Sequence, residues 1–561
     1  MKYQKIISIY TRKFTNLRHI YYRQYVTTTK KPIYITTPIF YVNAIPHIGH
    51  LYSAVMADSL KRYYELKGHK VIFSTGTDEH GLKIKQAAAK DNINPQEFCD
   101  KVSNKFKELF DTANISYTNF IRTTEQTHKD AVKNFWMRLM KNGFIYKGKH
   151  EGWYSVSDEA FYSTSQVQEI QNPNSEDKSM IAIESGQPVE WTTEENYKFR
   201  LSEFQDRLKR WLDENPQVIV PSNKFNEAKA WIDSGLTDLS ISRPHSRLDW
   251  GVEVPGDSEQ TVYVWLDALI NYLTVNGFPW QHEDMNGWPA DIHVVGKDIL
   301  RFHAVFWPAF LMAADLPLPQ KILAHSHWTM KKQKMSKSRG NVVDPIKVMN
   351  DYGVDTVRYY LMRDGGISDD GDYSDNNIKE RHRKDLAGQL GNLFSRSISP
   401  ALNPSLVVPS PIKFSNGVTE KDASLYNKLQ NLSDLVDKHF QDMEFGKGLS
   451  LIFEAVAEAN KHFTNNEPWK LKSDSDQKET VNNVLFYAAE TARISGILLQ
   501  PIMPTKMTEL LNNLGIQKEQ RTWEYSKFGK GWNIKNNRDI LIFYRGDNNG
   551  ILFPKLKLSS Q

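Results

Sequence analysis

Two histidines stand three positions apart near the beginning of the chain, His47 and His50, with Gly49 between them. If a helix begins here, both side chains lie on one face of its first turn, beside backbone N–H groups that have no partner within the helix. Such a helix end attracts anions, glycine permits close approach, and imidazole donates hydrogen bonds. The group suits a triphosphate, although two ordinary surface histidines would give the same pattern.

A second candidate for phosphate chemistry lies far downstream, in the segment 334–341, which reads Lys-Met-Ser-Lys-Ser-Arg-Gly-Asn. Its lysines, Lys334 and Lys337, are flanked by small hydroxyl residues in a loop that ends with glycine. Such a loop can bring positive charge to a phosphate and withdraw it. Taken alone, the segment could be a solvated basic loop, but together with the histidine pair it favours nucleotide chemistry.

The residues around the histidine pair alternate between strand and helix patterns. Residues 33–37 are β-branched and aromatic, a strand that we expect Pro38 to end. A helical stretch runs from the histidines to about Gly68, and Val71 opens a second apolar strand. Strand, helix and strand in this order predict a βαβ unit and a parallel sheet.

The pattern changes twice further along the chain. Short aromatic segments from about Lys147 indicate an insertion, and the α/β pattern resumes near Val262 and again at 291–296. Beyond Lys384, apolar residues repeat at helical spacing over 425–440, 449–463 and 484–498, and we expect the glycines at 446 and 448 to separate the first two helices. The fold class is therefore α/β: a Rossmann-like parallel-sheet domain interrupted by an insertion and followed by an all-α bundle.

Composition excludes several classes of protein. Hydrophobic residues make up 40% of the 561 residues and charged residues 24%, values typical of globular domains rather than disordered or fibrous chains. No run of 18 apolar residues occurs, so we expect no membrane span. The single cysteine, Cys99, excludes an internal disulfide and a zinc knuckle built from several thiolates.

The first 57 residues contain no aspartate or glutamate. Six lysines and arginines among residues 1–23 outweigh the whole net charge of +5. A basic, acid-free, hydroxyl-bearing leader without a long apolar core is typical of a mitochondrial transit peptide, and we expect cleavage between Tyr21 and Lys31. The alternative is a basic arm that contacts nucleic acid.

The two phosphate motifs together resemble the signature of class I aminoacyl-tRNA synthetases, and the blocks between and after them resemble methionyl-tRNA synthetases. The resemblance runs in order from about residue 33 to about 505. Its blocks are Thr37–Tyr41, Gly76–Gly81, Glu151–Tyr154, Val264–Ala268, Gly296–Ile299, Phe302–His303, Phe306–Pro308, Asn392–Leu393 with Arg396, and Asn466–Trp469.

The resemblance implies an ATP-dependent methionine–tRNA ligase of mitochondrial translation, located in the matrix. Methionine and ATP, with Mg²⁺ as part of the substrate, would give methionyl-adenylate and pyrophosphate, and the methionyl group would move to tRNA(Met). The implied catalytic residues are His47, His50 and Lys337. The implied ATP-binding residues are His47, His50, Gly296, Asp298, Lys334 and Lys337.

By the same resemblance, Asp78 pairs with the α-ammonium group of methionine. The side-chain pocket is implied to consist of Ile39, Tyr41, Trp265, Tyr272, His303 and Trp307. The anticodon is implied to meet Asn392, Arg396 and Trp469. For any one of these aromatic residues, plain core packing is the alternative.

The resemblance also divides the chain into segments. They are a transit peptide at 1–30, the halves of the catalytic domain at 31–145 and 251–330, a connective insertion at 146–250, the signature-loop and stem-contact region at 331–384, and the helical anticodon-binding domain with its tail at 385–561.

Two departures from the family pattern and three rival interpretations bear on this reading. Ser155 and Asp158 stand in the region where many relatives have zinc-binding cysteines, so we expect no zinc; Leu269 replaces a proline found in some members. The rivals are a class I synthetase for leucine, valine or cysteine, a nucleotidyltransferase with a small acceptor, and a non-catalytic RNA-binding module. The aromatic blocks, the bundle and the intact phosphate motifs respectively argue against them. We expect a monomer.

Overall fold

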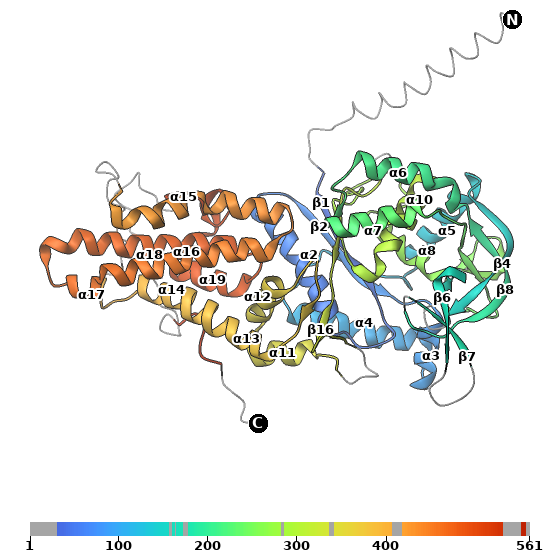
Figure 1. The fold of residues 1–561 in the computed structure, drawn as a ribbon, viewed down its shortest axis with the longest axis horizontal. Coiled ribbons are helices and arrows are strands. Elements are labelled where there is room, and N and C mark those ends of the chain that lie inside the picture. The colour runs from blue at the N-terminus through green and yellow to red at the C-terminus, as the bar shows by residue number, and fades with distance from the viewer. Residues whose placement is uncertain are drawn as a thin grey trace, which may run out of the picture.

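The computed structural model describes residues 31–155, 160–162, 164–171, 178–183, 185–281, 285–335, 341–404, 406, 418–530 and 551–556. The predicted transit peptide, Asp158 and Lys337 lie outside these residues. The molecule is elongated, with an α/β body at one end and a helical bundle at the other (Figure 1). No helix in the described part of the chain is both long and apolar enough to cross a membrane.

A six-stranded parallel sheet forms the centre of the body, which confirms the predicted α/β class. Its strands, in spatial order, are β3 (Asn119–Arg122), β2 (Val71–Asp78), β1 (Ile33–Tyr41), β14 (Ile292–Gly296), β15 (Ile322–His325) and β9 (Ile219–Val220). The chain order reverses between β1 and β14, the position at which open α/β sheets bind ligands. Every residue of β14 and β15 is buried, as expected for strands covered on both faces.

The two faces of the sheet belong to two different hydrophobic cores. Ile35, Val294 and Leu323 face a core that continues into the bundle, whereas the alternate residues face a core shared with the insertion. The helices that contribute to the first core are α2 (Ile48–Leu66), α3 (Leu82–Lys90) and α4 (Pro95–Thr112). The second core includes α5 (Gln126–Lys141), α8 (Val264–Leu269), α9 (Asn271–Thr274), a π-helical turn (Phe302–Phe306) and α10 (Trp307–Ala313).

Strand β1 does not end at Pro38, contrary to the prediction. It continues to Tyr41, and its pairing with β2 changes register between Thr36 and Ile39. Proline has no N–H to donate to the ladder, so an irregularity at this point lets the strand continue. The change of register carries β1 forward until Tyr41 pairs with Asp78 at the end of β2.

The segment predicted as an insertion forms mainly antiparallel structure. One sheet has the order β10 (Leu239–Ser240), β8 (Glu190–Phe199), β4 (Ile145–Ser155) and β5 (Ala160–Tyr162); a hairpin joins β6 (Val167–Gln171) to β7 (Lys178–Ala182). Helices α6 (Gln205–Glu214) and α7 (Ser222–Asp233) flank β9, which pairs with β15. This two-residue strand is too short to show in the sequence, and it ties part of the segment to the parallel sheet. A further sheet has the order β11 (Ser242–Pro244), β13 (Asp257–Val262) and β12 (Glu253–Val254).

A small sheet and three helices connect the body with the bundle. The sheet has the order β17 (Gln333–Lys334), β16 (Trp328–Met330) and β18 (Gly371–Asp372); the helices are α11 (Pro345–Tyr352), α12 (Val354–Asp364) and α13 (Asp375–Arg381). The fully buried Arg358 of α12 lies 2.6 Å from Asp58 of α2 and donates to the carbonyl groups of Pro501 and Ile502. A guanidinium with these partners fixes α2 relative to the bundle.

The predicted helical region is confirmed. After a π-helical segment (His382–Gly391), its helices are α14 (Asn392–Ser397), α15 (Glu420–Gln441), α16 (Phe445–Asn466), α17 (Pro468–Leu471), α18 (Lys478–Leu499) and α19 (Pro504–Asn513). Contrary to the prediction, the glycines at 446 and 448 do not separate α15 from α16. Both lie in the first turn of α16. A Cβ at Gly448 would lie 2.5 Å from the ring of Phe440, so this glycine permits close packing of the two helices.

Candidate active site

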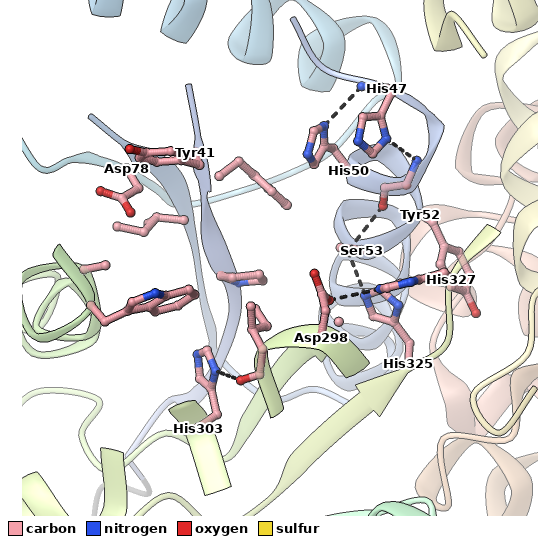
Figure 2. Close-up of a pocket in the computed structure, with 18 of the residues that line it drawn as sticks. Tyr41, His47, His50, Tyr52, Ser53, Asp78, Asp298, His303, His325 and His327 are labelled. Carbon is pink, nitrogen blue, oxygen red and sulfur yellow. Dashed lines mark hydrogen bonds and ion pairs between the residues drawn. The ribbon is translucent and has the colours of Figure 1, made fainter. Parts of the chain in front are cut away.

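A cavity of about 390 Å³ opens at the carboxyl ends of the central strands. Residues from both sides of the reversal in strand order between β1 and β14 line the cavity. They include Tyr41 and Asp78 at the ends of β1 and β2 and Gly296 at the end of β14. In Figure 2, Tyr41, Asp78 and His303 lie toward one side of the cavity, whereas His47, His50 and Asp298 lie toward the other. The cavity therefore has two chemically different ends.

The histidine pair lies at the beginning of α2, as predicted. His47 is the N-cap residue, and its Nδ1 accepts from the backbone N–H of Gly49 at 3.1 Å; Nδ1 of His50 accepts from the backbone N–H of His47 at 3.1 Å. The rings stack with centroids 3.8 Å apart. A nitrogen that accepts a hydrogen bond carries no proton, so both neutral rings have their proton on Nε2. The capping contacts thus prepare two donors beside a positive helix end.

Glycine at position 49 is a steric requirement of this arrangement. A Cβ there would lie 2.9 Å from Cε1 of His47, so any other residue would displace the capping ring. The ring of His50 in turn packs edge-on against Phe40, with the ring centroids 5.1 Å apart. The aromatic packing and the cap together fix both imidazoles before a ligand binds.

The end of the cavity beside His47 and His50 contains two further histidines that the sequence did not reveal, His325 and His327, which end and follow β15. Nε2 of His325 lies 2.7 Å from the Ser53 hydroxyl of α2, and its burial lowers the pKa of His325 to about 4, so the ring is neutral at pH 7. The contact ties β15 to the helix that carries His47 and His50. Polar residues at the end of a buried strand were the available signal, because ligands collect at that edge.

Asp298 faces the same side of the cavity, after the turn at Gly296 (Figure 2). Its Oδ1 lies 3.0 Å from Nε2 of His327. Desolvation alone would raise the pKa of Asp298, but the His327 contact and smaller contributions from neighbouring groups together outweigh it and lower the pKa to about 2. A Cβ at Gly296 would lie 2.6 Å from the same oxygen. The carboxylate is therefore ionised and held in a position that only glycine permits.

The other end of the cavity is aromatic. Trp265 stacks on Phe302 with centroids 3.6 Å apart, and the Tyr272 hydroxyl lies 2.7 Å from Nε2 of His303. Nδ1 of His303 lies 3.0 Å from the Ile299 carbonyl and donates to it, so Nε2 accepts from Tyr272. Burial lowers the pKa of His303 to about 4 and leaves this pair uncharged at pH 7. An uncharged aromatic pocket suits an apolar, polarizable side chain.

The structure brings most of the predicted methionine-site residues to one cavity, with one exception. Ile39, Tyr41, Asp78, Trp265, Tyr272 and His303 line it. Trp307 is fully buried, and its Nε1 lies 3.3 Å from Nε2 of His293, with its ring centroid 5.9 Å from that of Tyr272. It stands behind the Tyr272 wall rather than on the cavity surface.

The described residues cover only part of the predicted lysine loop and of the region for which no zinc is expected. The backbone of Lys334 belongs to β17 and pairs with Thr329, and the next residue, Met335, lines the cavity. Among the described residues, no group of three or more histidine, cysteine, aspartate or glutamate side chains could hold a metal ion. The absence of zinc stays a prediction.

The predicted RNA-reading residues meet on one surface of the bundle. Nδ2 of Asn392 and Nη1 of Arg396 both donate to Oδ1 of Asn460, at 3.0 and 3.2 Å. The Arg396 guanidinium lies 5.2 Å from the ring centroid of Phe463, which in turn stacks beside Trp469. Trp469 is 42% exposed, so its side chain is not part of the core.

Comparison with known proteins agrees with this geometry. The family model for tRNA synthetases class I (M) matches residues 33–398. The chain is 45% identical over 508 residues to the probable mitochondrial methionine–tRNA ligase of Neurospora crassa, covering 89% of this chain and 82% of that protein. It is 44% identical over 546 residues to the mitochondrial methionine–tRNA ligase of Homo sapiens, covering 94% and 91%.

Solved structures give the same result. A Mycobacterium tuberculosis methionyl-tRNA synthetase in complex with methionyl-adenylate is 40% identical, with a TM-score of 0.84 over 89% of this chain and 96% of that chain. The chain therefore belongs to the class I tRNA synthetases, and within them to the methionyl-tRNA synthetase family.

Proposed function

We propose that this chain is a mitochondrial methionine–tRNA ligase whose active site is the two-ended cavity. The observation that carries the proposal is the pairing of two prepared histidine donors at one end with an uncharged aromatic pocket and a carboxylate, Asp78, at the other. The names of the relatives and the adenylate-bound structural neighbour support it.

In the first step, a carboxylate oxygen of methionine attacks the α-phosphorus of ATP, and the bond from that phosphorus to the bridging oxygen of pyrophosphate breaks. The methionine carboxylate is ionised at pH 7, so the step requires no general base. Positioning and stabilisation of charge on the phosphate oxygens remain as the sources of catalysis. This requirement explains why the site offers Nε2–H donors and a helix end rather than an acid–base pair.

His47 and His50 would donate to the phosphates, and Lys334 and Lys337 of the signature loop would add positive charge to them. Magnesium enters with ATP as part of the substrate. Asp298 would accept hydrogen bonds from the ribose hydroxyls, since the His327 contact keeps it ionised and leaves its second oxygen for a ligand. Gly296 would act through Asp298, because a Cβ at this position would displace the carboxylate oxygen.

At the other end, Asp78 would pair with the methionine ammonium group, and Ile39, Tyr41 and Trp265 would contact the side chain. Tyr272 and His303 would lie near the sulfur, hydrogen-bonded to each other at 2.7 Å and kept uncharged by their burial. Trp307 would act from behind this wall by supporting Tyr272.

In the second step, a hydroxyl of the terminal adenosine of tRNA(Met) attacks the methionyl carbonyl and AMP leaves. The bundle, within the proposed domain 385–561, would read the anticodon: Trp469 stacks on a base, and Asn392 and Arg396 contact base edges and phosphate. The other proposed segments keep the boundaries given above. Residues 1–30 would direct the chain to the mitochondrial matrix, where it works as a monomer.

The direct test is ATP–pyrophosphate exchange with each of the twenty amino acids. Methionine should dominate, because shorter apolar side chains leave voids that cost about 1–3 kcal/mol per missing methylene. Exchange driven equally well by leucine or valine would overturn the assignment.

A further inference from the structure

A buried carboxylate outside the cavity joins the elements that form its methionine end. Asp267 of α8 is 1% exposed and lies between two buried imidazoles. Its Oδ2 is 2.6 Å from Nδ1 of His80, and its Oδ1 is 2.9 Å from Nε2 of His128. Neither histidine lines the cavity, and none of the three groups takes part in the reaction described above.

The protons of this triad can be assigned. Burial works to raise the pKa of Asp267, but the two imidazoles outweigh it and hold the pKa well below its usual range. The carboxylate is therefore ionised and only accepts, so Nδ1 of His80 and Nε2 of His128 each carry a proton. Charge-assisted hydrogen bonds of this length are strong and have defined geometry.

Each partner belongs to a different element beside the methionine end. His80 follows Asp78 by two residues, at the turn after β2. His128 lies on α5, and its Nδ1 is 3.1 Å from the Thr274 hydroxyl of α9, the helix that carries Tyr272. Asp267 itself is two residues from Trp265 on α8. One carboxylate thus connects the segments that bear Asp78, Trp265 and Tyr272.

The turn that carries Asp78 is anchored separately on its outer side. The fully buried Glu79 accepts from Arg122 at 2.7 and 3.0 Å, and its carbonyl accepts from Nε1 of Trp250 at 2.6 Å. These contacts hold the backbone in place without Asp267. The His80 contact adds what they do not supply, a direct connection from this turn to the aromatic wall on α8.

We propose that Asp267, with His80 and His128, is a positioning residue for methionine: it fixes the distance between the carboxylate of Asp78 and the aromatic wall. The inference rests on the proposed function, because it takes Asp78 as the partner of the methionine ammonium group. It assigns no role toward ATP, since the nucleotide end has its own anchors in Ser53, His325 and His327.

Two substitutions at one position test the proposal. His80→Leu removes the hydrogen bond to Asp267, whereas His80→Asn keeps an N–H donor near the position of Nδ1. We expect His80→Leu to raise the KM for methionine in ATP–pyrophosphate exchange by about tenfold to 100-fold. We expect the KM for ATP to stay near wild type and His80→Asn to restore most of the methionine affinity. A general loss of folding would not give this split or this rescue.

Asp267→Asn is the second variant, because it removes the charge while keeping the size of the side chain. It should give the same selective rise in the KM for methionine. A matched control is Asp422→Asn in the bundle, where Asp422 of α15 pairs with the buried His462 of α16 at 2.7 Å. Both helices lie at the opposite end of the molecule from the α/β body (Figure 1). This control should lower the melting temperature and leave both KM values unchanged.

Asp78→Ala separates this inference from the proposed site. If Asp78→Ala leaves the KM for methionine unchanged, the proposed methionine site fails, and the inference with it. If Asp78→Ala raises the KM for methionine while His80→Leu and Asp267→Asn do not, the proposed methionine site is supported and the positioning role of Asp267 is overturned. Equal increases in both KM values, or no restoration by His80→Asn, would also overturn it.

Discussion

The α/β body and the helical bundle hold their functional side chains in opposite ways. In the body, His47, His50 and His303 each have a ring nitrogen bound to the backbone, so their orientation is set before a substrate arrives. In the bundle, Trp469 is 42% exposed and rests with one face against Phe463.

This difference agrees with the roles that we propose for the two regions. Stabilising the charge of a transition state requires donors that need no reorganisation, which favours buried and fixed groups. Reading a splayed base requires an aromatic face that the base can reach, which favours exposure. We therefore expect substitutions in the two regions to affect different steps.

The largest effect should come from the signature loop. Lys337→Ala removes the cation that we propose to interact with the phosphates, so adenylate formation should fall by about 10²- to 10³-fold, while the KM for methionine changes little. ATP–pyrophosphate exchange measures both quantities. Lys428→Ala in the bundle, which removes a lysine paired with Glu454, is the control and should leave exchange unchanged. Normal adenylate formation with weak methionine binding would contradict the assigned role.

The next effect should appear only with tRNA. Trp469→Ala removes the face that we propose to stack on an anticodon base, and it should cost about 1–3 kcal/mol, roughly 5- to 150-fold in tRNA charging. Exchange needs no tRNA and should stay near wild type. Trp523, a buried tryptophan of the same half, is the matched control, because Trp523→Ala should lower the melting temperature and both activities together. If Trp469→Ala behaved like that control, the contrast between the two regions would fail.

The sequence predicted those features of the body and of the bundle that depend on apolar periodicity and on the position of a motif. Apolar spacing predicted α15, α16 and α18, and the histidine motif predicted the beginning of α2. What it missed depends on contacts between segments far apart in the chain. His325 and His327 become site residues only because β15 pairs beside β14 and ends at the cavity. Gly448 permits packing against Phe440, a role that a glycine in a sequence does not reveal.

As the pH falls, the α/β body should lose folding stability before the helical bundle does. Burial lowers the pKa of His303 and of His325 to about 4, and that of His293 well below its usual value. In the unfolded chain these groups titrate near 6.5, so stability is fully present above that pH and is lost as the pH falls toward 4. His303 and His325 should each lower the free energy of unfolding by about 2 kcal/mol at pH 5.

Region-resolved hydrogen exchange at pH 7.5 and pH 5 would measure this difference. Protection should fall first in β14, β15 and the π-helical turn, which carry His293, His325 and His303, and only later in α15 and α16. His303→Gln should recover about 2 kcal/mol of the loss at pH 5. Earlier loss of protection in α15 and α16 would reverse the comparison.

The smallest expected effect, none at all, comes from removing metal. The hairpins of the insertion pack Val167, Ala182 and Val189 against aromatic neighbours, and the one cysteine, Cys99, lies on α4 with its Sγ 3.4 Å from the Glu79 carbonyl. A zinc knuckle needs several thiolates, which one cysteine cannot supply. Chelation in magnesium-containing buffer should therefore leave the melting temperature and exchange unchanged, and elemental analysis should find no stoichiometric zinc. One equivalent of zinc, with a lower melting temperature after chelation, would show that the body needs a metal ion for a stability that its own packing does not provide.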